Sequence, residues 1–508
     1  MTVYHIIIIY QKIKIVEFKV MLTESIKMNY KPYIVLAAAV ICYVIPFLNF
    51  NLFFTNWIFF ALIIWIINSK SINILKIAIF FGTSTVLIGE YWIPETIRNL
   101  SGVNTAVSFS VHFLYAIYES LFFVAIFLFT KKILSLKKGF RAIKYLTIIL
   151  CYIILEEYYP RIFPYNLGNT QILFNSLSQH ISILGLNFLT FIVLMINFIF
   201  FEIFINKKVS KIILIGMTAM ILILISWDPT YNSTDKERLK VVILQPNNIK
   251  KNLNTMPNNK NFDLTIWPEN SYKLIDLDNK EFFSLFKQDF SNNHVFHTKY
   301  LLFGAITKKN NSFFNSSILI DQDKRIINIK NKKNLLMFGE FYPFKEYLSK
   351  LIPIFNNFIN LSKGKNILQE IGTIKSLVLI CYEDLFREDV HKIFKNENPS
   401  ILINITNDIW YGETIASYQH LMLSIPLSIE TQRYLIRSTN NGVTAVISNK
   451  GEIINMIEPF RFGTIEHEIP IITQKSKYVE YKVFIDIIGT LLFITFLTIL
   501  LKENRKIL

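Results

Sequence analysis

Charged residues are scarce in this sequence. Asp, Glu, Lys and Arg make up 18% of its 508 residues and hydrophobic residues make up 52%, whereas soluble globular proteins contain roughly 25% charged residues. This balance excludes a wholly soluble or a disordered protein, and it predicts a membrane-embedded portion together with a more polar domain. Acidic residues are the scarcer kind, which leaves a net charge of +16. Such an excess is typical of nucleic-acid binding, of contact with anionic lipid or of membrane topology.

Cysteine is also rare, and several site motifs are absent. The three cysteines, Cys42, Cys151 and Cys381, offer no pair that indicates a structural disulfide. The sequence has no Walker-type phosphate loop and no G-x-G-x-x-G, so no nucleotide is implied. The histidines of the polar interval, among which His420 is nearest to the motifs described below, lack the spacing of metal ligands. We therefore expect neither a metal nor another cofactor.

Apolar stretches long enough to cross a bilayer, about 20 residues each, crowd the first half of the chain. Seven are predicted there and an eighth follows a long polar interval, at 33–50, 52–67, 77–92, 107–129, 142–155, 181–204, 212–225 and 483–501. The first thirty residues contain no small-residue cleavage site, so we expect no cleaved signal peptide; Met21 and Met28 are alternative start sites.

Lys and Arg alternate between the two sides of these predicted spans. Up to the seventh span their numbers in successive connections are 5, 0, 2, 1, 6, 1 and 3, and three more follow the last span. Because positive connections stay in the cytoplasm, both termini are expected inside and the polar interval outside, with 19 of these residues inside and two outside. The interval 239–475 has a net charge of +5, which leaves +11 for the rest. The positive excess therefore indicates topology, and no nucleic-acid partner is expected.

The predicted organisation has five parts: a cytoplasmic extension at 1–32, a seven-helix transmembrane region at 33–226, an extracytoplasmic domain at 239–475, a transmembrane helix at 483–501 and a cytoplasmic tail at 502–508. In the polar domain, short β-branched runs alternate with turns rich in Asn, Lys and Asp. Strands are predicted at 241–244, 264–267, 300–305, 316–320, 326–329, 376–381, 401–405 and 444–447. Hairpin turns are expected at 321–324 and 449–451, and a helix at 418–435. This alternation indicates a layered α/β domain.

Three side chains of chemical interest directly follow predicted strands in this domain. Cys381 ends the apolar run L-I-C, where it is placed as a nucleophile or as a buried core cysteine. Glu269 follows Pro268, and it is either a base for a thiol or a solvated loop residue. The lysines of K-N-K-K at 330–333 are either stabilisers of a thiolate and an oxyanion or a solvated face. Each signal alone is weak.

Taken together, the order Glu, Lys, Cys resembles the nitrilase or carbon-nitrogen hydrolase superfamily, whose fold is an α-β-β-α sandwich. Six ordered motifs and the segment 245–248 further resemble the apolipoprotein N-acyltransferase family. The motifs are W-P-E at 267–269, F-G-E at 338–340, C-Y-E at 381–383, N-D-x-W at 407–410, Q-H at 419–420 and R-x-T-N-x-G at 437–442. That family is likewise a bundle of eight spans with a nitrilase-like domain inserted between the last two, so the resemblance covers nearly the whole chain.

The resemblance implies a role for each residue of this triad. Glu269 would be the general base, Lys332 the oxyanion-stabilising lysine and Cys381 the nucleophile. Lys332 is preferred to its neighbouring lysines because the family's lysine lies eight residues before the glutamate of F-G-E, which is Glu340 here.

Three further residues would complete the implied site. Glu340 would support the lysine, while Tyr382 and Glu383 would line the acyl site. Four positions, in the regions implied for the lid and the lipid contacts, depart from the family pattern. They are Lys330 for a tyrosine, Met337 for a proline, Leu427 for an arginine and Asn254 for a tryptophan.

The implied activity is a two-step acyl transfer. Its expected partners are a phospholipid acyl donor, the S-diacylglyceryl cysteine of an apolipoprotein as acceptor, and the membrane lipid around them. The expected location is the bacterial inner membrane with the catalytic domain on the periplasmic side. The aromatic stretches 335–344 and 351–358 are predicted either as lid segments that dip into the membrane interface or as core helices. Nothing in the sequence indicates an oligomer, so a monomer is expected.

Two rival functions keep parts of this interpretation. A membrane-tethered amidase would use the same triad with water as the acceptor, but it would not need seven spans. A transporter or sensor would use the outer domain only to bind a ligand. The predicted spans hold few charges apart from Glu90 and Glu119, whereas transport paths place ionisable groups at mid-depth.

Overall fold

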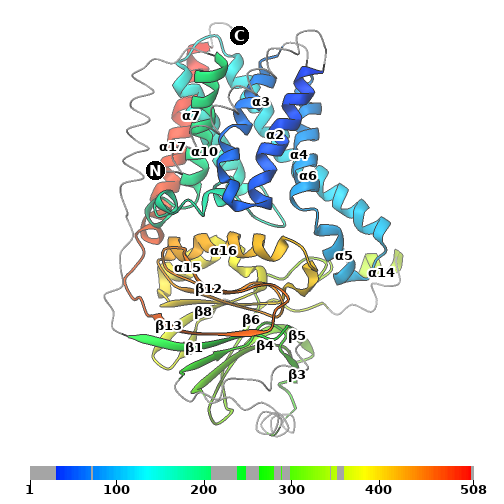
Figure 1. Cartoon of the computed structure of the whole chain (residues 1–508), viewed down its shortest axis with the longest axis vertical. Helices are drawn as coiled ribbons and strands as arrows, with labels where there is room; N and C mark the ends of the chain where they lie inside the picture. Colours follow the sequence, from blue (N-terminus) through cyan, green and yellow to red (C-terminus); the bar gives the residue numbers. More distant parts are fainter. Residues whose placement is uncertain are drawn as a thin grey trace, which may run out of the picture.

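The computed structural model describes residues 30–504 except for 70–71, 207–236, 248–261, 280–287, 289–297, 344, 352–359 and 366. The chain forms a bundle of long helices at one end and a two-sheet domain at the other (Figure 1). The helices of the bundle are α2 (Lys31–Leu48), α3 (Phe59–Ile67), α4 (Ile74–Gly89), α5 (Ile93–Ser101), α6 (Thr105–Ser135), α7 (Arg141–Tyr158), α8 (Asn175–Ser178), α9 (Ile181–Leu184), α10 (Asn187–Phe200) and α17 (Lys477–Asn504).

Eight membrane-spanning helices are predicted, and the described residues contain fewer. In the described part of the chain five helical stretches are long and apolar enough to cross a membrane, at Lys31–Leu48, Phe50–Ile67, Thr105–Ser135, Asn187–Ile205 and Lys477–Asn504. A sixth is present if α4 and α5 form one span, although they meet at a bend of 63°. Helix α7 falls at the predicted fifth span and carries four charged residues. The predicted seventh span, 212–225, lies outside the described residues. Eight spans are therefore not confirmed.

Aromatic side chains form the centre of the helical bundle. Tyr43 of α2 contacts the rings of Phe59, Phe81 and Phe123, which come from α3, α4 and α6. Gly82 permits this close packing, because a Cβ there would lie 2.6 Å from the Cα of Ser120 on α6. Burial of four such rings, at roughly 1.5–3 kcal/mol each, explains why helices far apart in sequence pack together.

Two β-sheets lie face to face beneath the bundle. The first has the order β13-β1-β2-β4-β5-β6, with β3 also paired to β4, and the second has the order β12-β11-β10-β9-β8-β7. The strands are β1 (Arg238–Gln245), β2 (Leu264–Ile266), β3 (Tyr272–Asp276), β4 (Tyr300–Lys309), β5 (Ser312–Asp321), β6 (Ile326–Asn331), β7 (Gln369–Ile371), β8 (Ile374–Ile380), β9 (Ile401–Thr406), β10 (Leu435–Thr439), β11 (Thr444–Ile447), β12 (Ile453–Ile457) and β13 (Gly463–Pro470).

All eight predicted strands are present, and both predicted hairpin turns are confirmed. The predicted helix at 418–435 is wrong at its end. Helix α16 (Ala416–Thr431) stops at Gln432, whose φ of +56° is left-handed, and β10 begins at Leu435. β-Branched residues after the left-handed residue favour a strand over further helix.

Helices α15 (Arg387–Glu397) and α16 lie between the second sheet and the helical bundle (Figure 1). The facing sides of the two sheets are apolar, with Ile243, Ile266, Ile380 and Ile405 fully buried in one cluster. Strands β8, β9 and β10 are parallel, as are β1, β2 and β4. Because parallel strands end at the same edge of a sheet, the segments after β2, β8 and β9 are brought together there. The described residues thus form an α/β domain of the predicted nitrilase-like kind, with helices on one outer face.

Candidate active site

Cys381 lies at the turn that ends β8. It is 8% exposed and has a φ of +54°, a left-handed conformation that a residue with a Cβ seldom adopts. The turn continues as the short helix η5 (Cys381–Leu385). Asn404 of β9 donates its side-chain amide to the Cys381 carbonyl at 2.8 Å, which holds the backbone in this conformation. Strain of this kind persists where the surrounding structure over-determines it, and it gathers at active sites.

Glu269 follows β2 and is 4% exposed. Its Oε1 accepts a hydrogen bond from the Asn315 side chain at 2.6 Å, and its backbone carbonyl accepts one from Asn440 at 2.7 Å. Gly304 lies directly against it, because a Cβ at that glycine would be 2.5 Å from the Glu269 Cα. Glu269 is thus held both at its carboxylate, by Asn315, and at its backbone, by Asn440 and Gly304.

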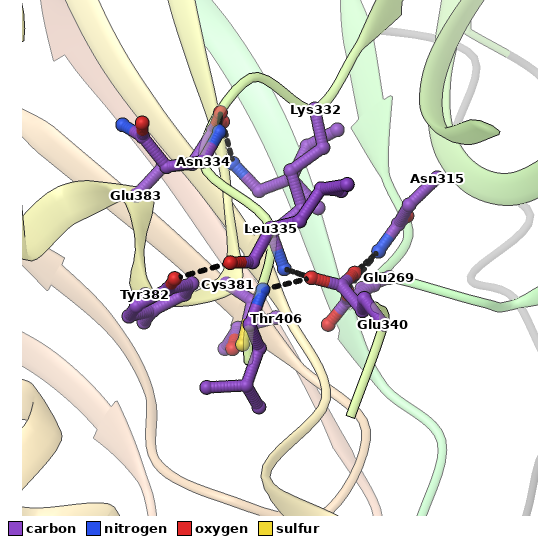
Figure 2. A network of polar contacts seen from close by, with 12 residues as sticks. Glu269, Asn315, Lys332, Asn334, Leu335, Glu340, Cys381, Tyr382, Glu383 and Thr406 are labelled. Atoms are coloured by element: carbon purple, nitrogen blue, oxygen red, sulfur yellow. Dashed lines mark hydrogen bonds and ion pairs between the residues drawn. The ribbon is translucent and has the colours of Figure 1, made fainter. Parts of the chain in front are cut away.

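Lys332 follows β6 and is 1% exposed. Its Nζ lies 2.8 Å from Oε2 of Glu340 and 3.7 Å from Oε1 of Glu269, and its backbone N–H donates to the Asn315 carbonyl at 2.7 Å. Figure 2 shows the side chains of Lys332, Glu269 and Cys381 pointing toward one another. The structure therefore brings the three predicted triad residues together.

The charges of this site follow from burial and from its ion pairs. Burial lowers the pKa of Lys332, but Glu340, Cys381 and Glu269 outweigh it and hold that pKa well above its ordinary value. Burial raises the pKa of the Cys381 thiol and Glu269 adds to the rise, against which Lys332 acts. Burial likewise raises the pKa of Glu269, although Lys332 opposes the shift. The resting site thus holds a protonated thiol beside a lysine cation, and a carboxylate whose raised pKa makes it a stronger base.

Glu340 and Tyr382 border the lysine. Besides its ion pair with Lys332, Glu340 shares the amide of Asn315 with Glu269, accepting a bond of 2.6 Å. The Tyr382 ring centroid lies 5.3 Å from the Lys332 Nζ, and the Tyr382 hydroxyl donates to the Leu335 carbonyl at 2.7 Å (Figure 2). Both side chains therefore fix the position of the ammonium.

Glu383 lies in η5, two residues after Cys381, and is 2% exposed. Its Oε2 accepts from the Lys330 Nζ at 2.5 Å and from the Ile380 N–H at 2.9 Å. Its Oε1 accepts from the backbone N–H groups of Lys333 and Asn334, at 2.7 and 3.2 Å. Each carboxylate oxygen of Glu383 therefore accepts two hydrogen bonds, so this side chain is not placed as a base in the way that Glu269 is. Its place in the wall of the acyl site stays a prediction.

The motifs N-D-x-W, Q-H and R-x-T-N-x-G meet in a buried charge network beside Cys381. Arg437 donates to Asp384 at 3.0 Å and to Asp408 at 3.2 Å, and its guanidinium also donates to Asn404 at 2.9 Å. His420 lies between the same two carboxylates, at 3.1 Å from each. Burial and Arg437 lower the pKa of His420, but the two aspartates outweigh them and raise it. The network therefore supports Asn404, which in turn holds the Cys381 carbonyl.

Two of these supporting residues escaped the sequence analysis. Asn315 joins both carboxylates to the lysine loop, and Asn404 holds the nucleophile turn. Asn404 interrupts the apolar run I-L-I-N-I of β9, and because a buried amide needs partners, that interruption was an available signal. Asn315 lies among the serines of β5, where the strand pattern gives no such signal.

Apolar side chains are exposed on the two segments that carry Glu340 and Asp408. Met337 and Phe338 are 40% and 46% exposed, and Ile409 of η6 (Asp408–Tyr411) is 49% exposed. Helix α5 of the bundle contacts the same edge, where Asn99 donates to the Trp410 carbonyl at 3.1 Å. Residues 344 and 352–358 of the two predicted lid segments lie outside the described residues. The described segments beside the site therefore expose apolar side chains and adjoin the helical bundle.

Comparisons with known proteins match both halves of the chain. The family model described as "Carbon-nitrogen hydrolase" matches residues 247–475, and that described as "Apolipoprotein N-acyltransferase N-terminal domain" matches residues 39–199. Among curated relatives, "Apolipoprotein N-acyltransferase" of Wigglesworthia glossinidia brevipalpis is 26% identical over 458 residues, covering 83% of this chain and 88% of the relative. The protein of the same name from Bdellovibrio bacteriovorus is 26% identical, covering 77% and 80%, and that from Rickettsia prowazekii is 28% identical, covering 78% and 83%.

Proposed function

This chain belongs to the apolipoprotein N-acyltransferase family, and from that premise we propose that it moves a fatty acyl chain from a phospholipid to the α-amino group of an S-diacylglyceryl cysteine at the start of a lipoprotein. The observation that carries the proposal is the meeting of Cys381, Lys332 and Glu269 in one buried space. A nucleophile, a base and a cation in one place are what acyl transfer through a covalent intermediate requires.

The first step acylates the cysteine. Glu269 takes the proton of the Cys381 thiol, and the thiolate attacks the ester carbonyl of the phospholipid. Lys332, together with nearby backbone N–H groups, stabilises the oxyanion of the tetrahedral intermediate. When the intermediate collapses, the ester C–O bond breaks and the leaving alkoxide takes the proton from Glu269. A lysophospholipid departs and a thioester remains on Cys381.

The second step passes the acyl chain to the amine. The neutral α-amino group attacks the thioester carbonyl, Lys332 again holds the oxyanion, and Glu269 accepts a proton from the nitrogen. The C–S bond then breaks, the amide leaves, and Cys381 regains a proton from Glu269. The two substrates use the same site in turn, so the kinetics are of the ping-pong type.

A membrane-bound site suits these substrates because both keep their acyl chains in the bilayer. A soluble enzyme would have to remove a chain at about 0.8 kcal/mol per CH₂ group, a cost on the order of 10 kcal/mol for a long chain. The exposed side chains of Met337, Phe338 and Ile409, on the segments that carry Glu340 and Asp408, support a site that meets the acyl chains at the membrane surface. The excess of Lys and Arg in alternate connections supports a catalytic domain on the periplasmic side of the inner membrane.

The proposal is tested by trapping the acyl-enzyme. The purified full chain is incubated with a phospholipid that carries a labelled acyl chain, and the protein is then examined for label that neutral hydroxylamine removes, as expected of a thioester. Wild type and Cys151→Ala should carry the label, and Cys381→Ala should not. Absence of label on the wild type, or label that persists on Cys381→Ala, would refute the proposed chemistry.

A further inference from the structure

A second buried ion pair lies beside the triad. The ammonium of Lys330 and the Oε2 of Glu383 are 2.5 Å apart, and the two side chains are 0% and 2% exposed. Lys330 lies near the end of β6 and Glu383 lies in η5. The mechanism proposed above uses neither charge. Burial of two charges is costly unless they are paired and hydrogen-bonded, so the pair calls for an explanation beyond stability.

The hydrogen bonds of Glu383 join the two loops of the site. The N–H of Ile380, the residue before Cys381, belongs to the nucleophile strand. The N–H groups of Lys333 and Asn334 belong to the loop that directly follows Lys332. A single carboxylate therefore links the backbone before the nucleophile to the backbone after the oxyanion lysine. These backbone donors are neutral, and the one full positive charge bonded to Glu383 is that of Lys330.

We propose that Lys330 is a positioning residue for Cys381 and Lys332, acting through Glu383. Its ammonium keeps Glu383 ionised and in place, and Glu383 holds the nucleophile turn against the lysine loop. The inference rests on the proposed function in that it takes Cys381 and Lys332 as the reacting pair. An error of about 1 Å in such a pair costs on the order of 10²-fold in rate.

Lys330 also balances the charge of the site. Two buried carboxylates, those of Glu269 and Glu383, and the partly buried carboxylate of Glu340 face the two ammonium groups of Lys330 and Lys332. Loss of Lys330 would leave one cation against three anions in a space of low dielectric, which opposes formation of the thiolate. The titratable groups that interact electrostatically with the Cys381 sulfur include Glu269, Lys332, Asp408, Tyr382, Tyr411 and Arg437.

The proposal is tested by alkylating Cys381 with iodoacetamide in the detergent-solubilised full chain. The rate at Cys381 is measured by peptide mass spectrometry between pH 6 and pH 10. Lys330→Met should slow the reaction at neutral pH roughly tenfold or more, on the order expected for a displaced reacting group, and should move its pH profile to higher pH. Lys330→Arg should restore most of the rate. Lys299→Met should behave as wild type, because that side chain is 69% exposed and pairs with Asp263 at 2.8 Å, away from the site.

A double variant separates positioning from folding. Lys330→Met with Glu383→Gln removes both charges, so no unpaired charge stays buried and the protein should fold even if Lys330→Met alone does not. Cys381 of the double variant should still react slowly, because the glutamine at position 383 has one acceptor oxygen for the backbone N–H groups that two carboxylate oxygens bind in the wild type. A wild-type rate and pH profile in the double variant or in Lys330→Met would overturn the proposal. Since alkylation needs no lipid, failure of the labelling experiment above would not affect this result.

Discussion

Glu430 in the last turn of α16 joins the catalytic domain to the helical bundle. Its carboxylate accepts from Arg387 of α15 at 2.6 Å, from the Leu186 N–H of the bundle at 3.0 Å, and lies 2.9 Å from the His391 Nε2. The residue three positions before it, where the family pattern has an arginine, is Leu427. In this chain the guanidinium comes instead from the neighbouring helix.

The structure sets a magnitude for the loss of this carboxylate. Burial raises the pKa of Glu430, but Arg387 and His391 outweigh it and lower the pKa from 4.5 to about 2. At about 1.4 kcal/mol per unit, the shift corresponds to about 3 kcal/mol of folding free energy. Because the pKa is lowered on folding, this stabilisation is fully present above pH 4.5 and is lost as the pH falls toward 2. Glu430→Gln should therefore lower the melting temperature at pH 7 by about 6–12 °C.

The assay is the thermal unfolding of the chain in nanodiscs, followed by tryptophan fluorescence at pH 7 and at several values down to pH 3. Glu466→Gln, at an exposed position of β13, serves as the control and should melt within about 1 °C of wild type, as expected for a surface substitution. The difference between Glu430→Gln and wild type should shrink below pH 4.5. A variant that melts like wild type at pH 7, or a difference that stays constant down to pH 3, would show that the carboxylate does not hold the two parts together.

Two further substitutions test the site itself. Lys332→Ala should abolish the labelled adduct and Lys333→Ala should keep it, because the first side chain faces Glu269 and the second faces the surface. Loss of the adduct in Lys333→Ala alone would place the oxyanion lysine one residue later. Gly442→Ala should destabilise the domain by about 1–3 kcal/mol, since a Cβ there would lie 2.1 Å from the Asp408 Oδ2. Gly489→Ala, inside α17 and with nothing within 4 Å, should not lower the denaturation midpoint, because alanine favours a helix over glycine; equal midpoints for the two variants would contradict the packing described.

The strands and their terminal residues could be predicted because each is a local pattern. An apolar run ending at Cys381 or at Glu269 places that side chain at a strand end whatever the rest of the chain does. The oxyanion lysine could be placed only through the family spacing to Glu340, since Lys330, Lys332 and Lys333 are residues of the same type and the sequence pattern does not distinguish them. The structure distinguishes them by partner: Lys332 faces Glu269 and Glu340, while Lys330 faces Glu383.

Other features depend on contacts between distant segments. The positive φ of Cys381 is held by Asn404 from another strand, and no local pattern announces it. The bend after α4 follows the break in helical geometry at Glu90, within a stretch apolar enough to be predicted as one continuous span. The eight predicted spans are likewise not confirmed: among the described residues five or six helices are long and apolar enough to cross a membrane, and hydropathy, which measures composition, does not detect the breaks and charges that divide or shorten a helix.

The most direct test of the proposed function is a chase of the acyl-enzyme. Labelled wild-type protein is freed of donor lipid and mixed either with a peptide whose first residue is S-diacylglyceryl cysteine or with buffer alone. The account predicts that the peptide clears the label from Cys381 much faster than buffer does, and that the label reappears as a hydroxylamine-resistant amide on the peptide. Equal clearance in buffer, with the label released as free fatty acid, would make water the acceptor and contradict the account.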